Sequence, residues 1–69
     1  MEDHTYKKIE IVGSSLKSSD DAVQNAIARA SKSIDQLRWF EVIETRGNIA
    51  DGKVERWQAT IKIGFTMRD

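Results

Sequence analysis

The apolar and polar positions of this chain change their period along its length, and the changes predict a strand, a helix and two further strands. Residues 5–12 are rich in β-branched side chains and stop at the Gly-Ser-Ser of residues 13–15, so we expect a strand that runs into a loop. Two serines and two aspartates occupy residues 18–21. A serine hydroxyl can accept a free N–H group and the acids favour the positive end of a helix, so a helix should begin there.

An amphipathic pattern follows this cap. Its apolar stripe recurs at spacings of four, three, four and three, and consists of Val23, Ile27, Ala30, Ile34 and Leu37, with Ala22 and Ala26 beside it. The opposite side is polar and carries Gln24, Asn25, Ser31, Lys32 and Asp35, with Arg29 and Arg38 near its margins. We therefore predict a helix of about 18 residues whose apolar face covers a sheet.

The rest of the chain alternates with the period of a strand. The first run should place Phe40, Val42, Glu44 and Arg46 on one side and Trp39, Glu41, Ile43 and Thr45 on the other. Asp51-Gly52 is a turn signal, and alternation resumes near Lys53. The second run has an apolar face formed by Trp57, Ala59, Ile61, Ile63, Phe65 and Met67. The two runs should form an antiparallel hairpin.

The order β-α-β-β predicts an α+β fold, with a three-stranded antiparallel sheet packed on one amphipathic helix. A strand of about 15 residues extends roughly 50 Å, whereas a helix of about 18 residues reaches about 27 Å. One helix cannot cover the apolar row of the whole hairpin, so we expect neighbouring subunits to cover the rest. A chain of this size buries about 60% of its unfolded surface, which also favours a core shared between copies. We expect residues 1–69 to form one domain.

Composition narrows the function classes. The 69 residues include 11 Lys+Arg and 11 Asp+Glu, which argues against a nucleic-acid binder driven by bulk charge. Without cysteine the chain has neither a disulfide framework nor a thiolate metal site. No apolar run approaches the roughly 20 residues of a membrane span, and the polar start lacks the apolar region of a signal peptide. We expect a cytoplasmic protein with no nucleic-acid or membrane partner.

The common catalytic motifs find little support in the sequence. His4 is the one histidine, and the four glycines do not form a phosphate-cradling loop. By alternation Glu41 and Glu44 fall on opposite faces of their strand, so they are poorly placed as a paired acid and base. We expect no catalytic residues and no metal site.

Two residues are candidates for ligand contact, and each also has a plainer interpretation. Trp39 lies where the predicted helix gives way to a strand, so its indole either packs in a core or interface or stacks on a ligand. Gln58 lies on the polar face of the last strand, where an amide is either solvated or paired with the donor and acceptor edge of a heterocycle. The pattern alone leaves both alternatives open.

Several short segments together resemble the bacterial branch of the dodecins, a family of small flavoproteins. The resemblance covers roughly Tyr6 to Phe65 and rests on these pieces, their order and their spacing: Tyr6-Lys7-Lys8-Ile9-Glu10-Ile11-Val12-Gly13-Ser14-Ser15, Ala28-Arg29-Ala30, Trp39-Phe40-Glu41-Val42, Thr45-Arg46-Gly47, Trp57-Gln58-Ala59 and Ile63-Gly64-Phe65. It implies a hollow homododecamer with cubic symmetry, which would cover the exposed hairpin face predicted above.

The resemblance also implies a flavin ligand. In the family, flavins bind in stacked pairs between subunits, sandwiched by tryptophans, and Trp39 matches that position. Gln58 matches the amide that bonds the pyrimidine-like edge of the flavin. Arg46 matches an arginine of FMN-binding members and is assigned to the phosphoryl end, the alternative being a surface ion pair with Glu44.

The implied function is storage. The resemblance predicts sequestration of FMN, or of riboflavin or FAD, with quenching of its photochemistry and no turnover. A flavin-dependent oxidoreductase and a ligand-free oligomeric scaffold are the alternatives. Some bacterial members also bind coenzyme A at basic positions, matched here by Lys7, Arg29 and Lys32, although Thr66 stands where those relatives often carry arginine, unless Arg68 substitutes for it.

Overall fold

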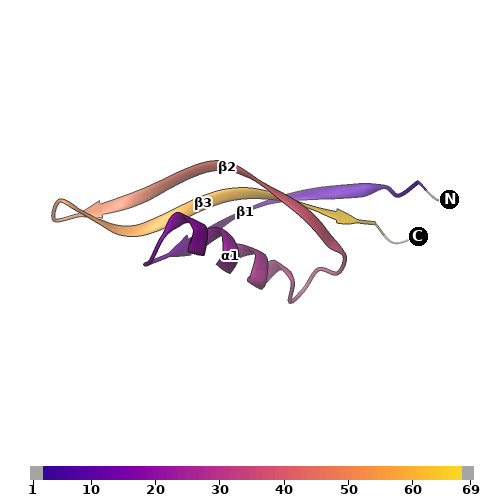
Figure 1. The fold of residues 1–69 in the computed structure, drawn as a ribbon, viewed down its shortest axis with the longest axis horizontal. Coiled ribbons are helices and arrows are strands. Elements are labelled where there is room, and N and C mark those ends of the chain that lie inside the picture. Colours follow the sequence, from indigo (N-terminus) through magenta and orange to yellow (C-terminus); the bar gives the residue numbers. More distant parts are fainter. Residues whose placement is uncertain (1–2, 68–69) are drawn as a thin grey trace.

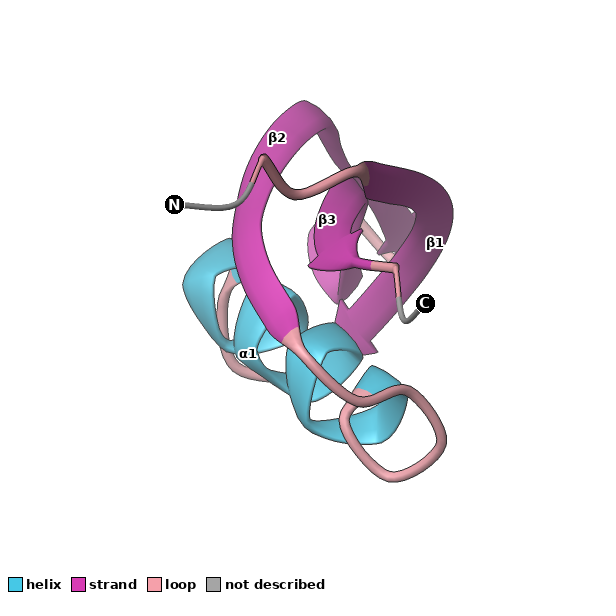
Figure 2. Ribbon diagram, turned by 90° about the vertical axis from the view of Figure 1, so that its right-hand side faces the viewer, coloured by secondary structure: helices cyan, strands magenta, loops and turns pink. Residues whose placement is uncertain are grey.

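An extended antiparallel sheet dominates the chain (Figure 1). The computed structural model describes residues 3–67, which form β1 (Tyr6–Ser15), α1 (Ser19–Ala30), β2 (Leu37–Ala50) and β3 (Lys53–Thr66). The central strand is β3, and it pairs antiparallel with β1 on one edge and with β2 on the other. One face of the sheet carries α1 (Figure 2). The predicted β-α-β-β fold, with one helix on a three-stranded antiparallel sheet, is confirmed.

Polar side chains join the end of β1 to the first turn of α1. Ser18 is the N-cap residue, and its Oγ accepts a hydrogen bond from the backbone N–H of Asp21 at 3.0 Å. The buried hydroxyl of Ser15 donates to Asp21 Oδ2 at 2.6 Å and accepts from the backbone N–H of Lys17 at 2.8 Å. The helix therefore begins where the serines and aspartates of the sequence predict it.

The first strand is longer than predicted. It continues through Gly13 to Ser15, and both residues remain paired with β3. A Cβ atom on Gly13 would lie closer than 3.0 Å to the carbonyl oxygen of Ala22 and to Cβ of Ala26. This glycine is needed because α1 crosses the strand at close range, so the prediction that it begins a loop was wrong.

The helix is shorter than predicted, and its buried face is centred on the alanines. It has 12 residues, not about 18, and ends at Ala30. Its buried residues are Ala22, Ala26 and Ala30. Val23 and Ile27 are half-buried at the margin, whereas Ile34 and Leu37 lie beyond the helix, Leu37 within β2. Small alanines allow the close approach to β1, so the centre of the buried face is shifted from the predicted stripe toward Ala22 and Ala26, while Val23 and Ile27 pack at its margin. No helix of the described residues is long and apolar enough to cross a membrane.

The core is small and centred on β3. Ala59, Ile61 and Ile63 are almost fully buried beneath α1. The β2–β3 hairpin extends well beyond the helix along a molecule 55 Å long (Figure 1), and Ile49 near its tip is 78% exposed. Met67, predicted on the apolar face of the last strand, follows β3 and is exposed. One helix leaves much of the hairpin uncovered, as the length comparison predicted.

A bulge in β2 reverses the predicted faces of the residues that follow it, whereas Trp39 to Val42 alternate as predicted. The register with β3 shifts between Val42 and Glu44, which leaves Ile43 as an additional residue. Alternation restarts after it, so Arg46 lies on the same face of the sheet as Trp39. The simple alternation had placed these two residues on opposite sides.

Candidate ligand-binding face

The predicted flavin contacts lie on the face of the sheet turned away from α1, here called the open face. Its members follow from the pairing of the three strands and include Tyr6, Lys8, Glu10, Val12 and Ser14 of β1, Trp39, Glu41, Glu44, Arg46 and Asn48 of β2, and Arg56, Gln58, Thr60, Lys62, Gly64 and Thr66 of β3. The face combines aromatic, amide and charged side chains. Trp39, Arg46 and Gln58 all belong to it.

The side chain of Trp39 reaches across β3 near the first residues of β1 and the last residues of β3. It is paired with Gly64 of the central strand, and three carbons of its six-membered ring lie over the position where that glycine lacks a side chain. Its indole meets the ring of Tyr6 on the far edge strand at a centroid distance of 5.2 Å and an interplanar angle of 70°. With 41% of its surface exposed, Trp39 packs against the sheet on one side and remains accessible on the other.

Arg46 and Gln58 form a directly bonded pair on the same face. They are opposite each other in the β2–β3 ladder, and Arg46 Nε donates a hydrogen bond to Gln58 Oε1 at 2.8 Å. A carbonyl oxygen has two lone pairs, so Gln58 Oε1 can accept a second bond while the amide nitrogen donates. The ion pair with Glu44 that the sequence left as an alternative is replaced by this bond, and Glu44 Oε1 accepts from the Thr60 hydroxyl at 3.5 Å.

The two carboxylates of β2 lie on one face, not on opposite faces as alternation predicted, because the bulge separates them. Each has a partner of its own: Glu41 Oε1 lies 3.3 Å from Lys8 Nζ, and Glu44 accepts from Thr60. The Lys8–Glu41 pair crosses β3 beside Gly64, with both side chains about half exposed. An exposed pair of this kind contributes little stability.

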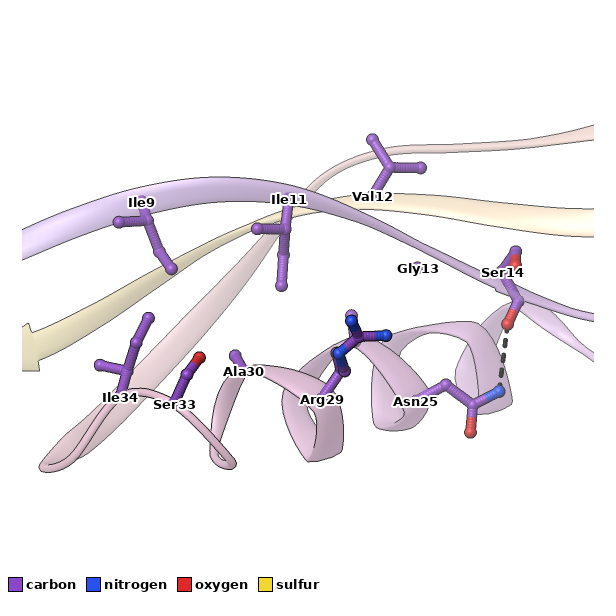
Figure 3. A pocket seen from close by; sticks show the side chains of 11 residues that line it. Ile9, Ile11, Val12, Gly13, Ser14, Asn25, Arg29, Ala30, Ser33 and Ile34 are labelled. Carbon is purple, nitrogen blue, oxygen red and sulfur yellow. Dashed lines mark hydrogen bonds between the residues drawn. The ribbon is translucent and has the colours of Figure 1, made fainter.

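The basic residues predicted for coenzyme A lie on the other side of the sheet. Arg29 lines a groove of about 430 Å³ between β1 and α1, in which Ile9 and Ile11 point toward the helix and Asn25 Nδ2 donates to the Ser14 carbonyl oxygen at 3.0 Å (Figure 3). Lys7 lines an adjoining hollow of about 390 Å³, which shares Ser33 and Ile34 with the groove. Lys32 is exposed in the turn after α1 and lines neither hollow.

The sequence analysis missed Arg38 as a neighbour of Thr66. Thr66 shares the hollow with Lys7, and its hydroxyl accepts a bond from Arg38 Nε at 3.0 Å. A guanidinium therefore stands beside Thr66, the position at which the resemblance implied an arginine for coenzyme A binding. The position of Arg38 directly before Trp39 could have indicated that it belongs to β2. The predicted helix was too long, so Arg38 was assigned to the margin of that helix. Arg68, named above as a substitute, lies outside the described residues.

Metal ligands do not gather in the described part of the chain. Within residues 3–67, no group of three or more histidine, cysteine, aspartate or glutamate side chains is close enough together to hold a metal ion.

Comparisons with known proteins agree on one family. A family model described as Dodecin matches residues 5–68. The chain is 42% identical over 64 residues to a dodecin of Thermus thermophilus, with 93% of each chain covered. It is similar to a solved dodecin of Streptomyces coelicolor, with a TM-score of 0.96, 46% identity and coverage of 100% of this chain and 99% of that one. A calcium-chelating dodecin of Mycobacterium tuberculosis is more distant, with a TM-score of 0.81, 31% identity and coverage of 93% and 91%.

Proposed function

The chain belongs to the dodecin family, and from that premise we propose that it stores a flavin, FMN in the first place, and shields it from photochemistry. The observation that carries the proposal is that Trp39, Arg46 and Gln58 share the open face, because the bulge in β2 turns Arg46 to the side of Trp39. An exposed indole, a bonded amide and a guanidinium match the three parts of FMN: a planar ring, a polar ring edge and a phosphoryl group.

Each of the three side chains has a distinct task in this proposal. The free side of Trp39 stacks on the isoalloxazine ring, a contact that contributes about 1 kcal/mol beyond burial. Gln58 bonds the donor and acceptor edge of the ring through its amide. Arg46 holds the Gln58 carbonyl through Nε and can offer its terminal nitrogens to the phosphoryl group. A bound flavin supplies the light-absorbing and redox-active ring.

The site is completed by a second copy of the chain. We infer a hollow homododecamer, in which residues 1–69 form one domain and flavins are held in pairs between Trp39 side chains of two copies. The exposed hairpin supports this assembly, because Val42, Ile49 and Val54 leave large apolar surfaces in water in the isolated chain. Burial of these residues between copies would supply core that a chain of this size lacks.

The open face fits storage better than turnover. The two carboxylates of β2 on this face both have partners, since Glu41 is paired with Lys8 and Glu44 accepts a hydrogen bond from Thr60. Stacking against indole on one side and a second flavin on the other would leave a substrate little access to the reactive ring. We therefore propose a binding protein, and not a flavin-dependent oxidoreductase.

The grooves beside α1 support coenzyme A as a second ligand. Lys7 and Arg29 border adjoining hollows, Arg38 stands beside Thr66, and all three can donate to phosphate groups. Lys32 is exposed and directly precedes Ser33 and Ile34, which line both hollows. It would contact coenzyme A only from outside the hollows. A coenzyme A titration by calorimetry tests this ligand, and Lys7→Met and Arg29→Met should each weaken it.

Titration of FMN fluorescence with purified protein tests the main proposal, on a sample whose mass is checked by light scattering. Saturable quenching on a dodecamer, lost in Trp39→Ala and retained in Trp57→Phe, is the expected result. Trp57 is the matched control because it lies on the helix side of β3. An assembled protein that leaves FMN fluorescence unchanged would favour the scaffold alternative. Continuous reduction of an electron acceptor by NADH with the FMN-loaded protein would favour the oxidoreductase.

A further inference from the structure

The indole of Trp39 packs directly on the backbone of Gly64. An added Cβ atom would lie closer than 3.0 Å to Cε2, Cζ2 and Cη2 of the indole, a separation that real side chains essentially never show. The backbone of Gly64 is itself buried, although it is on the open face. Glycine in the interior of a central strand weakens pairing and offers no side chain to pack, so its presence here calls for a reason. The reason is close approach of the indole to the backbone of β3.

Tyr6, on the opposite edge strand, restricts the orientation of the Trp39 indole. Its ring meets that of Trp39 in an edge-to-face arrangement, at 5.2 Å and 70°. Aromatic pairs favour this geometry because the positive edge of one ring meets the negative face of the other. The contact connects β1 to β2 across β3, since these two edge strands are not paired with each other. It therefore restrains rotation of an indole that is otherwise attached at one edge of the sheet.

The Lys8–Glu41 ion pair stands next to this aromatic contact. Lys8 follows Tyr6 by two residues on the same face of β1, and Glu41 follows Trp39 in the same way on β2. Their 3.3 Å contact also reaches across β3. Two cross-sheet contacts therefore lie side by side on the open face, and the aromatic one depends on the missing side chain of Gly64.

We propose that Gly64 and Tyr6 are positioning residues that set the plane of the Trp39 indole for stacking on the flavin. The proposal rests on the function proposed above and assigns roles to two residues that touch Trp39. Stacking gains energy from parallel overlap of ring faces, so an indole lifted from the sheet or free to rotate would lose that overlap. Gly64 sets the height of the indole above β3, and Tyr6 sets its rotation.

The first part of the test needs no ligand. In a Trp57→Phe background, Trp39 is the one remaining tryptophan, and near-ultraviolet circular dichroism with time-resolved anisotropy reports how firmly it is held. Tyr6→Leu and Gly64→Ala should each weaken the dichroism and shorten the anisotropy decay. Tyr6→Phe keeps the ring and should preserve both signals. Unchanged signals in Gly64→Ala would overturn the role of Gly64, and unchanged signals in Tyr6→Leu that of Tyr6.

The second part measures FMN quenching on variants whose assembly is verified by light scattering. Loss of a well-aligned aromatic contact should weaken binding about tenfold in Gly64→Ala and about threefold in Tyr6→Leu. Because Trp39→Ala is expected to lose quenching, equilibrium dialysis measures FMN binding in that variant and in the double variant. Adding Gly64→Ala to Trp39→Ala should change FMN binding no further, because the glycine acts through the indole. An additional loss in the double variant would overturn that role.

The two readouts also separate this inference from the proposed function. If the wild-type dodecamer does not quench FMN, the proposed flavin function fails, while the ligand-free signals still decide whether Gly64 and Tyr6 hold the indole. If the wild type quenches and Gly64→Ala and Tyr6→Leu quench equally well, the flavin function stands and the positioning roles fall. Failure of Gly64→Ala to assemble is itself informative through the double variant: rescue of assembly by Trp39→Ala supports the clash with the indole, and no rescue contradicts it.

Discussion

Replacing Arg46 with methionine separates the two tasks assigned to its guanidinium. The substitution keeps much of the aliphatic side chain but removes the 2.8 Å bond from Nε to Gln58 Oε1, together with the positive charge proposed for the phosphoryl group. Riboflavin carries the same ring system as FMN without the phosphoryl group. The ratio of the two affinities therefore isolates the phosphoryl contact from the support given to Gln58.

The expected losses follow from the exposure and the charge of the groups. Arg46 is exposed and Gln58 half-buried in the chain, so loss of their hydrogen bond should cost about 1 kcal/mol, or about fivefold in riboflavin affinity. A hydrogen bond between charged groups contributes about 1.5–3 kcal/mol, so FMN should lose a further factor of about 10 to 100. The affinity for FMN should therefore fall more than the affinity for riboflavin in Arg46→Met.

The assay is fluorescence quenching of both flavins by wild type, Arg46→Met and Arg56→Met at fixed ionic strength. Arg56 is a matched control because it lies on the same strand and face as Gln58, two residues away, and its loss removes the same charge. Equal losses for the two flavins in Arg46→Met would refute the phosphoryl contact. Equal losses for FMN in the two variants would assign the effect to general charge attraction, and unchanged riboflavin binding would refute the support of Gln58.

Three further predictions concern the stability of the fold, each measured by urea unfolding followed by circular dichroism. Gly13→Val should lower stability by about 3 kcal/mol or abolish folding, because its side chain would collide with Ala22; a stable variant would show that α1 can move away from β1. Ser15→Ala should cost about 1–3 kcal/mol by leaving backbone N–H groups without their acceptor, whereas an unchanged midpoint would mean that water replaces the hydroxyl. Gly52→Ala should cost about 1 kcal/mol because φ is +72° in the hairpin turn, and no loss would contradict a strained left-handed conformation there.

The features that could be predicted from the sequence are those governed by local chemistry. Asp51 and Gly52 have φ values of 53° and 72°, and this left-handed pair of turn residues joins β2 to β3 as the Asp-Gly signal indicated. The N-cap at Ser18 is equally local, since the hydroxyl and the N–H group that it accepts lie three residues apart. In both cases, the energy that selects the structure comes from neighbours in sequence.

The helix shows what local pattern could not supply. Its buried face is made of alanine because Gly13, on another element, leaves room for a close approach. A hydrophobic stripe ranks large residues above small ones, so it was centred on Val23 and Ile27 and left the buried Ala22 and Ala26 beside it. The correct face depends on the surface against which the helix packs, and that surface lies elsewhere in the sequence.

The candidate site depends on a long-range feature of the same kind. Alternation is a rule with a period of two, and one additional residue reverses every face that follows it. Ile43 is that residue, and the register of β2 against β3 shows it where the sequence of β2 does not. Without the bulge, Arg46 would point to the helix side and could not bond Gln58. A residue type can therefore indicate the ligand chemistry, while the pairing between two strands decides whether Trp39, Arg46 and Gln58 lie on the same face of the sheet.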